Sequence, residues 1–453
     1  MNTLKVGFAA VNANPPLGIS VAGYYVPRYA KGFLDDIMVK TLVLNCGEKK
    51  IALISVDNCS IKAELSKPWM EEIEKVTGIP KDNIFLAATH THTGPQIHMS
   101  ASGEEEDDKL IAQYLPFLGQ RIVNSVQLAL ADVKGARMGY IYGWAPERVA
   151  YIRRYMMKDG TTFTCPPIDD PNIDYALGEL DQRVNVLRFD QEDGQTIVLV
   201  NYGLHADTVN GEMISADWPA WMAKTLDKAL DGVKTIFFNG AEGDVGSTNV
   251  HPTGGDMNDT EISFDNEMKS PGMARFVGRA LAGTVLQVFD KVCYVDVDDI
   301  DIQKKTVVVP SNMASPEELP LAKQYWQWHL EGRDDLIPYK AMQLTTAVAE
   351  AMRMVMHEHG PETYDVNLTA VKIGPVALLG MPGEPFTDIG VEIKKAEGWD
   401  LVLPCCLVNG SIRYFPMQSA FDEGGYEARS CFFKAGVAER IIEGAKQLLD
   451  EMK

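Results

Sequence analysis

Five short apolar stretches, each followed at once by a loop of polar and glycine residues, constrain the fold of this chain most strongly. They cover residues 84–88, 196–204, 235–238, 376–379 and 401–408. Short apolar runs that end at turn signals are typical of buried strands. In open α/β sheets the functional groups lie at the carboxyl ends of strands, where loops converge. The sequence therefore predicts that several loops meet at one edge of a sheet.

Helical patterns alternate with these stretches. Helical periodicity is expected at residues 66–76, 112–131 and 273–288, and a hairpin at residues 41–56. Residues 315–359 are almost wholly helical in pattern and begin with helix N-terminal signals, so they are expected to form a helical insertion. The alternation predicts an α/β fold with mixed β-sheets flanked by helices and with the site at strand carboxyl ends. No low-complexity linker divides the chain, so residues 1–453 are expected to form a single domain.

Composition excludes several classes of protein. The formal net charge of −21 over 453 residues argues against a nucleic-acid footprint and against docking on anionic membrane by charge. Seven cysteines at irregular spacing give neither a disulfide framework nor a Cys-x-x-Cys zinc site. The N-terminus lacks a signal-peptide pattern, and no run of about 18 apolar residues predicts a membrane span. A cytoplasmic protein is the expectation.

The loop after the first apolar stretch carries His90-Thr91-His92. Side chains at positions i and i+2 of a strand point to one face, so both rings are expected to address one small volume. Imidazole is the commonest metal ligand and the usual general base near neutral pH. A metal site is the first hypothesis, and a pair of histidines bonded to backbone is the alternative. Two histidines, one glutamate and one tyrosine from four strand ends would suit zinc.

The run Ala88-Thr-His-Thr-His-Thr-Gly-Pro95 resembles the zinc-binding Thr-His-Thr-His-Ser-Gly-Pro motif of the neutral/alkaline (non-lysosomal) ceramidases. Four further stretches are similar to family segments and occur in the same order: residues 201–205, 239–245, 382–387 and 409–430. The resemblance spans roughly residues 5 to 450. It implies a divergent member of the family that corresponds to the N-terminal catalytic domain, without the immunoglobulin-like domain that follows it.

The resemblance implies an activity and a set of site residues. It assigns His90, His205, Glu384 and Tyr414 as zinc ligands, and the spacing from Asn409 through Tyr414 to Tyr426 selects Tyr414. His92 becomes the histidine that exchanges protons with water and the leaving amine. The expected function is a zinc-dependent amidohydrolase of lipid metabolism that cleaves an N-acyl amide by metal-activated water. Tyr414 and an arginine would stabilise the developing oxyanion.

Two departures from the family pattern bear on the substrate. Gly246 stands where the family has a serine that touches the reacting carbonyl, and Ser247 comes one position late. Ser247 is the shifted candidate for this catalytic role, but a slip of one residue on an extended segment turns a side chain to the opposite face, away from the carbonyl. Arg153 is the nearest counterpart of the family arginine, and Arg148 is the rival alignment. The departures leave two substrate classes open, a ceramide-like N-acyl amide and a more polar one.

Several alternatives stay open at this stage. A zinc esterase or another metallohydrolase would use a similar site, and a catalytically impaired binding protein of the same fold would retain it. Asp207 or Asp244 is expected to fix a histidine tautomer, although Asp207 equally fits a plain turn. The expected partner is a small-molecule N-acyl amide. A homo-oligomer and a second metal ion also stay open.

Overall fold

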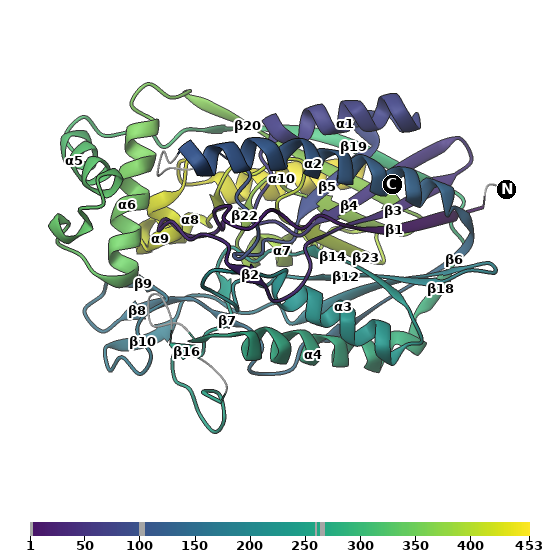
Figure 1. Ribbon diagram of the computed structural model, residues 1–453, viewed down its shortest axis with the longest axis horizontal. Helices are drawn as coiled ribbons and strands as arrows, with labels where there is room; N and C mark the ends of the chain where they lie inside the picture. Colours follow the sequence, from purple (N-terminus) through teal and green to yellow (C-terminus); the bar gives the residue numbers. More distant parts are fainter. Residues whose placement is uncertain (1–2, 99–104, 259–260, 263–267) are drawn as a thin grey trace.

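Two mixed β-sheets packed face to face form the centre of the computed structural model, which describes residues 3–98, 105–258, 261–262 and 268–453 (Figure 1). The larger sheet runs in the order β14 (Lys234–Asn239), β12 (Thr196–Tyr202), β11 (Arg183–Gln191), β6 (Lys134–Trp144), β1 (Lys5–Asn12), β3 (Met38–Cys46), β4 (Lys49–Val56) and β5 (Ile84–Ala88), and β18 (Cys293–Val295) pairs with β6. The smaller sheet runs β19 (Ile300–Pro310), β20 (Thr363–Ile373), β21 (Val376–Gly380) and β23 (Leu401–Cys405).

Apolar side chains from both sheets fill the space between them. Phe85, Leu199 and Phe238 of the larger sheet belong to the same buried cluster as Leu378 and Leu403 of the smaller sheet. Each of these side chains is 0% exposed. Because both faces of each sheet are covered, these strands read as nearly continuous apolar runs rather than as alternating patterns.

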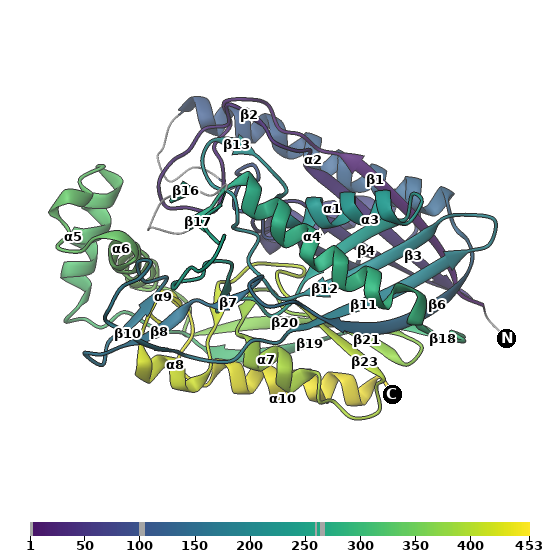
Figure 2. The ribbon, with the colours of Figure 1, turned by 90° about the horizontal axis from the view of Figure 1, so that it is seen from below.

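Helices cover the outer faces of the sheets, which gives four layers (Figure 2). The outer face of the larger sheet packs against α1 (Ala63–Thr77), α2 (Glu105–Ala131), α3 (Asp217–Ala229) and α4 (Pro271–Val288). The outer face of the smaller sheet packs against α7 (Thr387–Ile393) and α10 (Val437–Glu451). The prediction of an α/β fold with mixed sheets flanked by helices is confirmed. None of the described helices has the length and hydropathy that a membrane span requires.

The predicted helical insertion lies at one end of the sheets. Residues 315–359 form α5 (Leu319–Leu330) and α6 (Ala341–Met356) between β19 and β20, on the left in both ribbon views. Helix α6 packs against the short helix α9 (Tyr426–Ser430), and α8 (Gln418–Glu423) precedes α9. The insertion therefore adds a helical pair beside the end of the sheets where the loops converge.

Parallel pairing brings the predicted strand ends together. β5 runs parallel to β4, β14 to β12, and β23 to β21, so the loops after these strands leave at common edges. A backbone bridge between Ala87 and Val408 joins the edges of the two sheets. The predicted hairpin at residues 41–56 is formed by β3 and β4.

The segment at residues 145–181 is less irregular than its composition suggests. It forms the short strands β7 (Tyr151–Ile152), β8 (Arg154–Met157), β9 (Thr162–Thr164) and β10 (Ile173–Ala176). Strand β7 pairs with β15 (Val245–Gly246), which extends the loop after β14. This pairing holds Arg153, between β7 and β8, against the loop that carries Asp244 and Gly246.

Candidate metal centre

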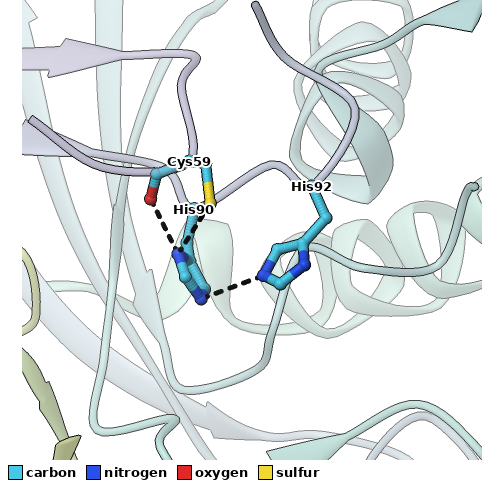
Figure 3. A group of neighbouring side chains, drawn as sticks. All are labelled: Cys59, His90 and His92. Atoms are coloured by element: carbon cyan, nitrogen blue, oxygen red, sulfur yellow. Dashed lines mark hydrogen bonds between the residues drawn. The ribbon is translucent and has the colours of Figure 1, made fainter. Parts of the chain in front are cut away.

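His90 and His92 meet through a turn and not through a shared strand face. Strand β5 ends at Ala88, and His90 has a left-handed φ of 71°. The two ring centres nevertheless lie 4.6 Å apart, and the two Nε2 atoms are 3.2 Å apart (Figure 3). The sequence prediction that both rings address one volume is correct, but the period-two strand geometry behind it is wrong.

The backbone fixes the orientation of the His90 ring. Its Nδ1 lies 2.7 Å from the carbonyl oxygen of Cys59, and the Cys59 Sγ is 3.9 Å away (Figure 3). With Nδ1–H donated to this carbonyl, Nε2 presents a lone pair on the other side of the ring. That Nε2 lies 3.4 Å from Oε2 of Glu384.

His205 is held in the same way after strand β12. Its Nδ1 lies 2.9 Å from the carbonyl oxygen of Glu242 and 2.5 Å from the Oε2 carboxylate oxygen of the same residue. Its Nε2 lies 3.6 Å from Oε2 of Glu384. Two imidazole Nε2 atoms therefore face one carboxylate oxygen.

Glu384 reaches this point because two short strands pair in parallel. Strand β22 (Glu384–Pro385) lies beside β24 (Tyr414–Phe415), with Glu384 directly opposite Tyr414. Its Oε2 is buried and has no hydrogen-bond donor among the described residues. This buried carboxylate oxygen receives no hydrogen bond and faces two imidazole nitrogens. One oxygen and two nitrogens in this arrangement are suitable ligands for a metal ion.

The electrostatics of this group are dominated by burial and by opposite charges. Burial alone would lower the pKa of His90, but the carboxylates of Glu384 and Glu242 outweigh it and raise that pKa well above its usual range. Burial alone would raise the pKa of Glu384, and the neighbouring His90 and His205 instead hold it well below. The carboxylate is therefore ionised, as a metal ligand must be.

His92 faces a second, different network. Its Nδ1 lies 3.6 Å from Oδ2 of Asp207, which accepts hydrogen bonds from Lys269 Nζ at 2.6 Å and, through Oδ1, from Tyr24 Oη at 2.7 Å. Burial holds the pKa of His92 well below its usual range, although Asp207 opposes this effect. Gly23, with φ of 105°, allows the chain to pass so close to His92 that a Cβ would lie 2.7 Å from the His92 Cβ.

Arg153 joins the metal-facing group to Tyr414. Its Nη1 lies 3.1 Å from Nε2 of His205, and its Nη2 lies 3.1 Å from the hydroxyl of Tyr414. Its Nε donates to the fully buried Glu427 at 2.8 Å. Arg148, the rival alignment, instead pairs with Asp256 at 2.8 Å on the wall of a separate groove. The structure thus brings Arg153 and not Arg148 to the histidines.

The remaining predicted residues lie around this group. Ser247 is buried and lines both a small cavity with Arg153 and His205 and a groove of about 830 Å³ along α4. Gly246 has no positive φ, and a Cβ there would lie 3.6 Å from the Cβ of Arg153, an ordinary contact. Asp244 Oδ1 accepts from the backbone N–H and the hydroxyl of Thr387, and within the described residues no hydrogen bond or ion pair joins Asp244 to a histidine.

Glu242 is the residue that the sequence interpretation missed. It is 0% exposed, and its carboxylate belongs to the group His90, His205, Glu242 and Glu384, whose ligand atoms lie within 4.8 Å of one another. It contacts the Nδ1 side of His205, whereas Glu384 lies on the Nε2 side. An acidic residue in a strand-end loop, three positions after Asn239, was the available signal.

A small cavity opens beside the metal-facing group. It measures about 60 Å³ and is bounded by the N-terminal loop, by α6 and by the two tyrosines of the final segment. Residues that line it include Tyr24, Tyr25, His92, Met342, Tyr414 and Tyr426. His92 and Tyr414 therefore border the same cavity.

Comparison with known proteins identifies the fold. No protein-family model matches the sequence, and no curated protein matches it significantly. The structure is similar to the crystal structure of neutral ceramidase from Pseudomonas aeruginosa, with a TM-score of 0.72 and 16% identity over 100% of this chain and 75% of that chain. It is also similar to a ceramidase complexed with C2, with a TM-score of 0.72 and 15% identity over 100% of this chain and 76% of that one. The chain has a neutral-ceramidase-like fold, divergent in sequence.

Proposed function

We propose that this protein is a zinc-dependent hydrolase that cleaves the C–N bond of an N-acyl amide. The observation that supports this most directly is the meeting of two imidazole nitrogens and one carboxylate oxygen, which come from separate strand-end loops. The likeness to ceramidase structures supports a hydrolase of this kind. The reaction consumes one water and yields a carboxylic acid and an amine.

His90, His205 and Glu384 would hold the metal, with Tyr414 as the fourth ligand or as its close neighbour. Nitrogen and oxygen donors of this kind suit zinc, and catalytic zinc sites keep one position for water or substrate. When bound, zinc lowers the pKa of water and polarises the scissile carbonyl. The carbonyl oxygens of Cys59 and Glu242 keep both Nε2 atoms aimed at the metal position.

His92 would move the proton. Its Nδ1 side faces Asp207, so Nε2 faces the metal-binding group and accepts a proton from water there. The same nitrogen then donates this proton to the leaving amine. The low pKa of buried His92 keeps the ring neutral and able to accept a proton before the reaction. Asp207, held by Lys269 and Tyr24, orients the ring.

Tyr414 and Arg153 would stabilise the charge that develops on the carbonyl oxygen. In the arrangement where Tyr414 neighbours the metal, its hydroxyl stays protonated and donates a hydrogen bond, because burial raises its pKa well above its usual range. Arg153 is pre-oriented by Glu427 and by the carbonyl oxygen of Gly243. Donors that are fixed before the reaction need no reorganisation when charge develops.

A direct test combines metal analysis with a substrate panel. Protein purified without added metal should carry close to one zinc per chain. It should hydrolyse members of a series of N-acyl amides of varied chain length, with matched acyl esters as the comparison. Zinc-loaded protein that cleaves the esters and none of the amides would make it an esterase. Protein that binds no metal would overturn the proposal.

A further inference from the structure

Arg413 reaches the cavity wall through Tyr25, and it forms no ion pair with a carboxylate in the part of the chain that the structure describes. The side chain of Arg413 is half-buried, and its Nη1 donates to the hydroxyl of Tyr25 at 3.2 Å. Its Nη2 lies 3.6 Å from the Sδ of Met352, and its guanidinium lies 5.5 Å from the centre of the Phe432 ring. These contacts are neutral, and the Glu384 carboxylate acts on the Arg413 charge through space without forming an ion pair.

The two cations that line the cavity differ in this respect. Arg153 donates to the Glu427 carboxylate at 2.8 Å, and Lys269 donates to the Asp207 carboxylate at 2.6 Å. Both line the cavity, and both are paired with acids, the buried Glu427 and the partly buried Asp207. Removing a charge from water without a counter-charge is costly. An anionic ligand at Arg413 would compensate for that cost.

The backbone at Arg413 does not explain why an arginine is there. Its φ is 78°, in the left-handed region that favours glycine. Its carbonyl oxygen accepts from the backbone N–H of Glu384 at 3.0 Å, so the turn helps to position the metal-binding glutamate. Glycine would make the same turn without strain. A side chain held in a strained conformation beside a site points to a role for that side chain.

Tyr25 connects Arg413 to the cavity. Its hydroxyl accepts from Arg413, and both Tyr25 and Tyr426 line the same cavity as His92 and Tyr414. A phenol that accepts from a cation is a stronger donor toward a further acceptor. The cavity measures about 60 Å³, so an anion bound at this wall would lie close to the amide.

We propose that the substrate amide carries a carboxylate, and that this carboxylate binds at the wall formed by Arg413, Tyr25 and Tyr426. This inference rests on the proposed amide hydrolysis. A planar guanidinium matches a carboxylate in geometry and charge. The carboxylate belongs either to the amine part, as in an N-acyl amino acid, or to the acyl part, as in a half-amide of a dicarboxylic acid, and the chemistry at the wall is the same.

Two pairs of matched substrates test the proposal on zinc-loaded protein. The first compares N-octanoylglycine with N-octanoylethanolamine, and the second compares the succinyl and butyryl amides of one amine. In one pair kcat/KM should be roughly 10- to 100-fold higher for the anionic member, the scale of a charged hydrogen bond. The pair that shows the preference identifies which part of the substrate carries the carboxylate.

Variants then assign the preference to Arg413. Arg413→Gly fits the φ of 78° and should abolish the preference by reducing kcat/KM for the anionic member far more than for the neutral one. Arg413→Lys should retain part of it. Arg429→Met is the matched control, because Arg429 is paired with Glu350 and should leave the preference unchanged. Equal activity on both members of both pairs in the wild type, or an equal loss on both in Arg413→Gly, would overturn the proposal.

A binding measurement separates this inference from the proposed function. Calorimetric titration of N-octanoylglycine and N-octanoylethanolamine into His92→Gln measures affinity where proton transfer is removed. Suppose that the wild type cleaves no amide, but that His92→Gln binds the glycine conjugate more tightly and His92→Gln/Arg413→Gly does not. That result would refute amide hydrolysis and support the anion site. If the wild type hydrolyses amides and His92→Gln binds both compounds equally, amide hydrolysis stands and the anion site is refuted.

Discussion

The metal-binding floor and the cavity wall are built in different ways. The floor, His90, His205 and Glu384, comes from loops directly after buried strands, and its rings are fixed by backbone carbonyls. The wall includes Tyr25 from the N-terminal loop and Met342 from the helical insertion. The floor is therefore held by the sheets, whereas the wall comes from segments outside them. Under the proposed function the floor would supply the chemistry and the wall would select the substrate.

The largest expected effect tests the floor itself. His90→Ala or His205→Ala should remove the metal and all measurable hydrolysis, because each deletes one of three buried donors. Zinc per chain, measured by mass spectrometry after gel filtration, checks this. His251→Ala is the control, since His251 is exposed and its ring lies 3.6 Å from the carboxylate of Asp169. Full metal content in either floor variant would show that the assigned ligand is wrong.

The next effect separates proton transfer from metal binding. His92→Gln should retain zinc and lose roughly 10²- to 10⁴-fold in kcat, the usual scale for a general acid or base. The reason is geometric: His92 lies beside the floor, but its Nδ1 faces Asp207 and no backbone carbonyl. Steady-state kinetics with parallel metal analysis measure both quantities. If zinc is lost together with activity, His92 belongs to the floor.

Much of the floor could be predicted from the sequence, because it depends on local signals. An apolar stretch precedes His90 and another precedes His205, and both predict strands. The ends of such strands converge in α/β folds. The ceramidase resemblance then adds Glu384 and Tyr414, which the structure places opposite each other in paired strands. The sequence did not reveal that His90 has a left-handed φ, because a turn of this kind depends on the surrounding contacts.

The wall was much harder to predict, because it depends on contacts between distant segments. Tyr25 lies 388 positions before Arg413, to which it is hydrogen-bonded, and no local pattern signals this pairing. Glu242 was missed for a related reason. The loop that carries Glu242 resembles the family's Gly-Asp-Val segment. That resemblance does not indicate which side of the His205 ring the Glu242 carboxylate contacts. Long-range packing, and not propensity, decides both cases.

A third prediction tests whether Glu242, which contacts His205, contributes to metal binding by the floor. Glu242→Gln should weaken zinc affinity roughly 10- to 100-fold, the usual cost of removing a carboxylate that orients a ligating histidine. Asp244→Asn is the matched control two positions later. Asp244 is also buried, and burial raises its pKa to about 6, but it accepts from Thr387, and within the described residues no hydrogen bond or ion pair joins it to a histidine. Competition with a chromogenic chelator measures the affinity. Equal loss in both variants would indicate loop destabilisation and not an effect on His205.

The smallest expected effect concerns Ser247, where floor and wall meet. The ceramidase resemblance implies that a serine contacting the reacting carbonyl belongs at the position of Gly246. Here a Cβ at Gly246 would lie nearest to Arg153, while Ser247 also lines the separate groove along α4. Ser247→Ala should therefore lower kcat far less than the roughly 10²- to 10³-fold expected for the loss of an oxyanion donor.

Gly246→Ser should fold normally, because Gly246 has no positive φ and the nearest atom to its Cβ is 3.6 Å away. If Gly246→Ser hydrolyses ceramide and the wild type does not, this position determines that the wild type does not accept ceramide. A hundredfold loss in Ser247→Ala, with zinc content and Tm unchanged, would instead assign Ser247 to the floor and favour ceramide as the substrate.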